Sequence, residues 1–239
     1  MSTTLLKESA TGARLGRRAG LGAAAGLAAL LVAFGAGPAF AAPDNGHVDV
    51  VFAGLNSTDD QLTLGSNDEE AEVYYDATGA AAVTWSGAQS DGSGGYVIDE
   101  EAATGFLWAG FAGAGDEAPE GVNPLLNVLA PWEDYDEGND TWGTEGDTVT
   151  LTLVSVTGAG TAGLTFSSNP NLEVGGTGTV LDPYTYTFKV QEGDEAYHVH
   201  PTWHFSDAGD YYFTFVASTS ASGVANSAPL TYHFKVPSL

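Results

Sequence analysis

Strict two-residue alternation of apolar and polar side chains is the feature that most constrains this fold. In residues 148–153, Val149, Leu151 and Leu153 alternate with three threonines. Successive side chains of a β-strand point to opposite faces, so this pattern indicates a strand with one face in the core. The same alternation occurs in residues 184–190, 211–218 and 230–236.

Shorter segments with the same character predict further strands at residues 47–53, 72–75, 81–85 and 106–111. Clusters of Gly, Asn, Asp and Ser separate them, as is typical of turns. No segment after residue 41 has a helical period. We therefore expect an all-β fold, an antiparallel immunoglobulin-like β-sandwich of about eight strands that forms one domain over residues 42–239.

Residues 113–146 interrupt the alternation and contain Trp132 and Trp142. A stretch of this length is too long for an ordinary hairpin loop. We expect it to be either a functional segment or an irregular acidic, Trp-containing lid.

The first 41 residues are typical of a secretory signal peptide. A basic start is followed by an uncharged Ala/Gly/Leu-rich stretch at residues 20–37 and by the small-x-small pattern Ala39-Phe40-Ala41. Cleavage is predicted after Ala41, and a retained membrane anchor is disfavoured because the stretch is Gly-rich and only weakly hydrophobic. Arg17-Arg18 leaves both general secretion and twin-arginine export open. The expected location is secreted or on the extracellular cell surface, without membrane insertion after cleavage.

The charge balance becomes more acidic once this segment is removed. Only two cationic residues remain, Lys189 and Lys235. Glu8 is the one acidic residue lost, so 30 carboxylates remain and the formal charge is −28. Such a surface lacks the Lys and Arg that nucleic acids and anionic lipids require, and it attracts cations. The chain has no cysteine, which excludes disulfides, thiolate metal ligands and cysteine nucleophiles.

The densest group of chemically active side chains is His198-Val199-His200, followed by Pro201. Residues two apart on a strand share a face, with Cα atoms about 6.6 Å apart, so both imidazoles can converge on one metal ion. Pro201 would stiffen the chain next to the pair. The alternative is a pair of ordinary surface histidines. The neighbours Trp203 and Phe205 are expected in the core, and His204 and His233 are expected on the surface.

A metal ion needs further ligands, and His47 is the third candidate. His47 and Asp49 are expected on one face of a strand, with Val48, Val50 and Phe52 on the other. The predicted metal ligands are therefore His47, His198 and His200, for Zn²⁺ or Mn²⁺, with Asp49 or a carboxylate of residues 113–146 as a further ligand. Neutral imidazole is the ligand form, so affinity should fall as the pH drops through about 6.5.

Other chemistry finds little support. The acidic run at residues 133–137 lacks the spacing and the glycine of a calcium-binding EF-hand loop. The chain has no Gly-x-Ser-x-Gly, His-Glu-x-x-His or phosphate-binding motif. We expect that the protein is not an enzyme, and a carboxylate-dependent secreted hydrolase is the disfavoured alternative.

The segment from His198 to Tyr211 resembles the His-x-His-x-x-Trp-x-Phe … Pro-Gly-x-Tyr signature of the actinobacterial surface-anchored protein domain. This domain is also known as the choice-of-anchor M domain, an ABC-transporter-associated wall repeat family. The opening Gly46-His47-Val48-Asp49 is similar to the start of the same domain. The resemblance spans most of residues 46–218 and is most specific at its two histidine-bearing ends.

The resemblance implies an exported receptor that passes a metal ion to the substrate-binding protein of a metal-type ABC transporter. It implies His47, His198 and His200 as site residues and Trp203 as a structural one. Pro201-Thr202 and Ala208 depart from the family pattern, and the last residues carry no sortase motif. A freely secreted form is therefore favoured over an anchored one. The alternative is a structural or adhesive surface module without metal, with an exposed aromatic patch in residues 113–146.

Overall fold

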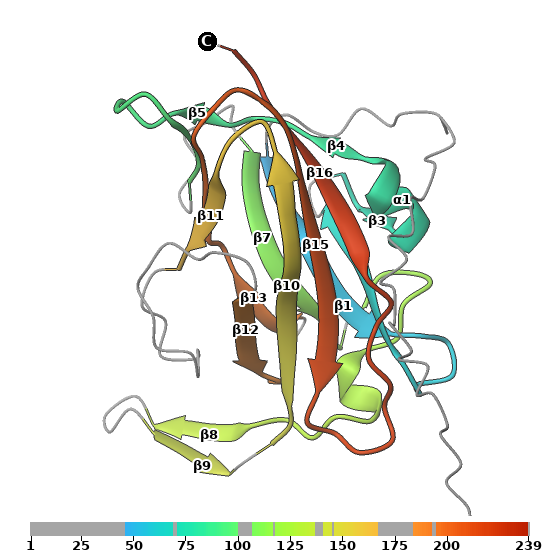
Figure 1. Ribbon diagram of the computed structural model, residues 1–239. Coiled ribbons are helices and arrows are strands. Elements are labelled where there is room, and N and C mark those ends of the chain that lie inside the picture. The colour runs from blue at the N-terminus through green and yellow to red at the C-terminus, as the bar shows by residue number, and fades with distance from the viewer. Residues whose placement is uncertain are drawn as a thin grey trace, which may run out of the picture. The chain divides into compact units, whose positions relative to one another are not determined.

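The alternating segments of the sequence form strands, including the two longest, in a computed structural model of the protein (Figure 1). The structure describes residues 46–68, 71–99, 107–116, 118–136, 141–144, 146–166, 184–192 and 195–238. Only the backbone is described for residues 133–136, 141–144, 184 and 195–196. The predicted signal peptide lies outside the described residues.

The first of two five-stranded sheets contains all four strongly alternating segments. Its order is β12-β10-β15-β16-β4, and β10 pairs with β12 and β15 in antiparallel register, as does β15 with β16. We call it the C-terminal sheet, and its strands are β12 (Tyr184–Lys189), β10 (Thr148–Gly158), β15 (Gly209–Thr219), β16 (Leu230–Val236) and β4 (Thr84–Trp85).

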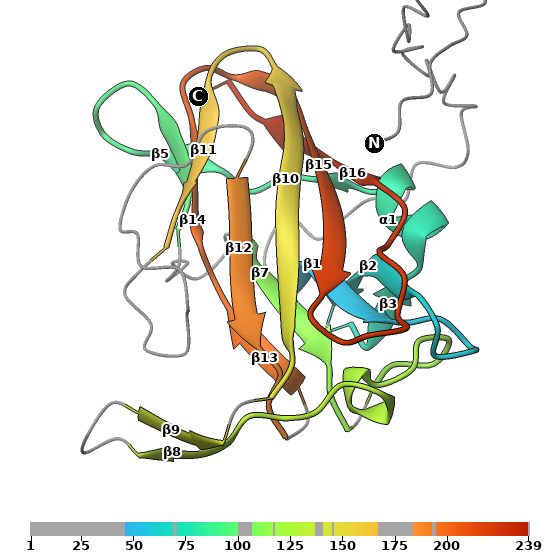
Figure 2. The same ribbon diagram turned by 60° about the horizontal axis from the view of Figure 1, so that its bottom comes forward.

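The second five-stranded sheet, which we call the histidine sheet, has the order β13-β7-β1-β2-β3. Its strands are β13 (Glu195–Val199), β7 (Leu107–Ala114), β1 (Gly46–Leu55), β2 (Leu62–Asp68) and β3 (Val73–Tyr75). Figures 1 and 2 show β10 and β15 lying across β7 and β1, so the two sheets face each other.

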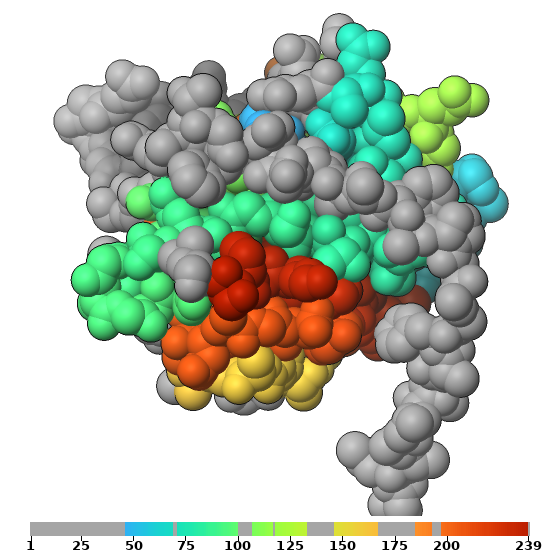
Figure 3. Space-filling model, turned by 90° about the horizontal axis from the view of Figure 1, so that it is seen from above, coloured from blue at the N-terminus to red at the C-terminus, as the bar shows by residue number. Residues whose placement is uncertain are grey.

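Two smaller sheets complete the described strands. A four-stranded sheet has the order β11-β14-β6-β5, with β11 (Ala162–Thr165), β14 (Thr202–Phe205), β6 (Tyr96–Ile98) and β5 (Gln89–Ser90). A separate hairpin contains β8 (Glu133–Asp136) and β9 (Thr141–Thr144). Seen from above, the green segment that carries β4 to β6 runs beside the red strand β16 (Figure 3).

One hydrophobic core fills the space between the two large sheets. The apolar residues of the alternating segments are buried in it, including Val149, Leu151 and Leu153. Trp203 is fully buried, and its ring lies 5.6 Å from Phe111 of the histidine sheet and 4.5 Å from Phe234 of the C-terminal sheet. Phe205 is also buried. The prediction that these two aromatic residues belong to the core is confirmed.

The prediction of a β-rich fold is confirmed for the described residues, but these contain sixteen strands instead of about eight, and two further details are wrong. The sheets are not purely antiparallel, because β1 pairs with β7 and β16 pairs with β4 in parallel register. The segment 81–85 is only partly a strand, because the short helix α1 (Ala77–Ala82) precedes β4. Asp76 caps this helix by accepting a hydrogen bond from the Gly79 amide, and alanine is the best helix former.

The expected face assignment of β1 is also wrong at one position. The register of β1 shifts between Asp49 and Val51 against β7, which marks a β-bulge. Val50 and Val51 therefore both belong to the main core, and Phe52 lies in a separate cluster with Ala112 and Val122. A bulge adds one residue to the strand, so the side chains after it point to the face opposite to the one that strict alternation predicts.

Residues 113–146 contain the end of β7, the 3-10 helix η1 (Leu125–Asn127) and the β8–β9 hairpin. Trp132 fixes this segment to the C-terminal sheet, because its Nε1 donates to the Asp147 carbonyl at 3.0 Å and Lys189 Nζ lies 4.5 Å from its ring centroid. The side chain of Trp142 lies outside the described residues. In the described part of the chain, no helix has the length and apolar character needed to cross a bilayer.

Candidate metal centre

The first two residues of the centre lie on β1, in the part of the strand that pairs with β7. His47 and Asp49 are two positions apart and share a face of the histidine sheet. In the parallel register, His47 lies opposite Trp108 and Asp49 lies opposite Gly110. The β1–β7 pair therefore supplies one wall of the centre.

His198 and His200 come from the other side of β7, but not from one continuous strand. His198 is on β13, opposite Ala112 of β7, and β13 ends at Val199. His200 and Pro201 connect β13 to β14, which belongs to the four-stranded sheet. The prediction that both imidazoles project from a single strand is wrong, because the chain changes sheets here and Pro201 has no amide hydrogen for a ladder.

The three histidine side chains nevertheless converge at one point. The Nε2 atom of His47 lies 3.0 Å from that of His198 and 2.7 Å from that of His200. The Nε2 atoms of His198 and His200 are also 2.7 Å apart. All three rings thus present the same nitrogen to a common point, which is the arrangement that a shared cation requires.

Asp49 is the fourth member of the cluster and is completely buried. Its Oδ1 lies 3.2 Å from His198 Nε2, and one ligand atom from each of the four residues lies within 4.8 Å of the others. Neither carboxylate oxygen accepts a hydrogen bond within the described part of the chain. A buried carboxylate without hydrogen bonds is costly, and a cation bound beside it would offset that cost.

Trp108 and Gly110 also belong to the centre, although sequence reasoning did not select them. The Trp108 ring stacks on His200 with centroids 4.3 Å apart and lies 4.8 Å from the His47 ring. A Cβ atom at Gly110 would lie 2.7 Å from both Asp49 Oδ1 and His200 Cε1. Glycine is therefore required at this position for the carboxylate and the imidazole to approach β7.

Trp203 ties the His200 segment to the strand beneath the centre. Its indole Nε1 donates a hydrogen bond of 3.1 Å to the carbonyl oxygen of Ala109, the residue between Trp108 and Gly110. This bond is buried and joins β14 to β7. The bond therefore helps to fix the position of the His200 segment relative to β7.

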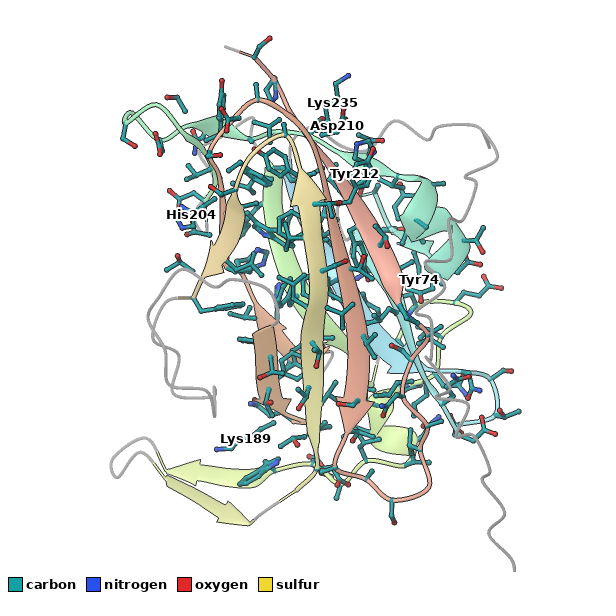
Figure 4. All side chains as sticks on the ribbon, viewed as in Figure 1. Tyr74, Lys189, His204, Asp210, Tyr212 and Lys235 are labelled. Carbon is teal, nitrogen blue, oxygen red and sulfur yellow. The ribbon has the colours of Figure 1, made fainter. Side chains whose placement is uncertain are left out.

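The other two histidines lie outside the centre and are half-buried rather than free on the surface. His204 Nε2 is 2.9 Å from Thr165 Oγ1, and Figure 4 shows His204 beside β11. His233 is placed between Thr84 and Asp210, with contacts of 2.8 Å to each. The side chains of residues 133–137, considered above as further ligands, lie outside those described.

Chemically, three imidazole nitrogens and one carboxylate oxygen form a donor set for a divalent transition metal. No sulfur donor is present, because the chain has no cysteine. Comparison of the chain with models of protein families, with curated proteins and with solved structures finds no match.

Proposed function

We propose that this protein is a binding module for a divalent transition metal ion. The observation that carries the proposal is the convergence of His47, His198 and His200, with Nε2 atoms 2.7–3.0 Å apart, beside a buried carboxylate. Zn²⁺ is the first candidate and Mn²⁺ the second, since imidazole suits the former and carboxylate favours the latter.

We base the proposal for the wider biological role on the sequence. The signal peptide supports export, and the strongly acidic composition supports accumulation of cations near the surface. Together with the family resemblance, these features support a secreted or surface-exposed receptor that hands its ion to the substrate-binding protein of a metal-type ABC transporter. We propose a non-enzymatic role, and an immunoglobulin-like arrangement for the two large sheets.

Calorimetric titration of the purified domain with Zn²⁺ and with Mn²⁺ tests the metal function. We expect one ion per chain, and at least a hundredfold loss of affinity in a His198→Ala/His200→Ala double variant. His204→Ala is the matched control, because His204 is close in sequence but contacts Thr165 instead of the centre. The metal affinity of the His204→Ala variant should equal that of the wild type.

Two outcomes would contradict the proposal. The first is the absence of stoichiometric binding by either ion. The second is unchanged binding in the double variant. Either result would leave the alternative of a structural or adhesive module, which predicts no rise in melting temperature when metal is added.

A further inference from the structure

The spacing of the three imidazole nitrogens carries information about the coordination geometry. With Zn–N bonds of 2.0–2.1 Å, tetrahedral coordination separates ligand nitrogens by about 3.3–3.4 Å, and right-angled coordination separates them by about 2.8–3.0 Å. The observed separations are 2.7, 2.7 and 3.0 Å. They fit three ligands on one face of an octahedron better than three corners of a tetrahedron.

The fourth donor is Asp49, whose Oδ1 lies 3.2 Å from His198 Nε2. Asp49 is fully buried, whereas the His198 side chain keeps 29% of its surface exposed. Among the described residues, the other donors therefore approach the centre from the interior and from β7, and His198 is the most exposed of the four. A facial set of three imidazoles with one carboxylate supplies four donors to an ion that has room for more.

We propose that the cation held here keeps at least one coordination position open toward solvent on the His198 side. Water occupies this position in the free protein, and a donor atom of an outside ligand can replace it. This inference rests on the proposed metal function and specifies it: the cargo is an exchangeable divalent cation rather than a closed structural ion. Such an ion can pass to an acceptor through a shared-ligand complex, without first leaving the protein.

The test uses Co²⁺ as the probe, because its visible absorption depends on its coordination number. Tetrahedral Co²⁺ absorbs strongly, and five- or six-coordinate Co²⁺ absorbs weakly. We expect a weak band in the wild-type protein at one equivalent of Co²⁺. Added azide should shift that band in a saturable way by binding the open position. The His204→Ala variant should give the same spectrum and the same azide response.

A second readout is the relaxation of water protons by bound Mn²⁺, which is enhanced when a water molecule sits in the inner coordination sphere. Strong Co²⁺ absorption that azide does not change, together with no Mn²⁺ relaxation enhancement, would overturn this inference and leave the metal function standing. The absence of stoichiometric Co²⁺, Mn²⁺ and Zn²⁺ binding would instead overturn the metal function, and the inference with it.

Discussion

His47 and His200 are separated by 153 positions in the sequence, and their Nε2 atoms lie 2.7 Å apart. The two residues meet because β7 pairs with β1 on one side and with β13 on the other. The ring of Trp108 on β7 contacts both imidazoles. The order of the strands therefore brings the ligands together. The residues around the centre can be substituted one at a time.

Asp49→Asn should weaken metal binding and stabilise the metal-free protein. The substitution keeps the shape of the side chain and removes the charge that a cation would neutralise. We expect at least a tenfold loss of Zn²⁺ affinity, and a rise of about 1 kcal/mol in the free energy of unfolding without metal, since a buried charge lacking hydrogen bonds is costly. Urea unfolding with and without Zn²⁺ measures both effects. A metal-free protein that is less stable than the wild type would contradict this explanation.

Gly110→Ala should close the centre from the β7 side. The added methyl group would lie 2.7 Å from Asp49 Oδ1 and from His200 Cε1, so at least one ligand must move. We expect loss of most Zn²⁺ affinity and a destabilisation of about 1–3 kcal/mol. Gly79→Ala is the matched control, because a Cβ atom there meets nothing nearer than 3.4 Å. Equal Zn²⁺ affinities of the two variants, measured by calorimetry, would show that the space beside Gly110 is not needed.

Trp108 should report binding through its fluorescence. Its ring stacks on a proposed ligand, so a bound paramagnetic ion such as Co²⁺ would lie within a few ångströms and quench its emission. We expect saturable quenching in the wild type that is strongly reduced in Trp108→Phe, with a remainder from Trp203, whose indole bonds to the Ala109 carbonyl beneath the centre. Trp132→Phe should retain it, because Trp132 contacts Lys189 and Asp147 instead. Quenching of the same size in Trp108→Phe as in the wild type would place the ion elsewhere.

Alkaline pH should destabilise the protein through Tyr74. Burial, assisted by the nearby charge of Asp76, raises the pKa of Tyr74 to about 12 from an ordinary value of 10. The unfolded chain releases this proton near pH 10 and the folded chain holds it, so stability present below pH 10 is lost as the pH rises toward 12. The shift corresponds to about 3 kcal/mol. Burial also raises the pKa of Tyr232, so Tyr74 accounts for part of the effect.

Melting temperatures measured between pH 8 and 11.5 test this expectation. The wild type should lose stability above pH 10 more steeply than Tyr74→Phe. Tyr212→Phe is the control, because Tyr212 is 38% exposed on β15, and Figure 4 shows Tyr74 and Tyr212 at separate places. Parallel curves for the wild type and Tyr74→Phe would assign the alkaline sensitivity to other groups.

Alternation predicts a strand where it is uninterrupted and fails where the backbone departs from regular pairing. The segments that became β10, β12, β15 and β16 were identifiable because one face of each packs into the core. Phe52 was assigned to the wrong face, since a bulge in β1 depends on its partners rather than on its own sequence. The parallel pairing of β1 with β7 was equally hidden, because pairing direction is a property of the chain path.

Only some residues of the candidate centre could likewise be predicted from the sequence. His47, His198 and His200 attract attention because imidazole is scarce in this chain and chemically distinctive. Trp108 and Gly110 carry no such mark, because an aromatic residue and a glycine within an apolar segment look like ordinary strand residues. Their roles depend on lying opposite His47 and Asp49, which only the register reveals. The break at Pro201 was visible as a proline, but the change of sheet that follows it was not.

The order of strands in the histidine sheet also affects when the centre can form. Among the described residues, β1 and β7 come early in the chain and β13 comes near its end, so the ligands of β1 cannot meet His198 and His200 until the chain is nearly complete. Pairings between distant segments form slowly, because long loops must close first. A chain crossing a membrane in unfolded form would carry four scattered side chains with little affinity for an ion. Under the proposed export and metal function, loading with metal would therefore wait until folding has finished.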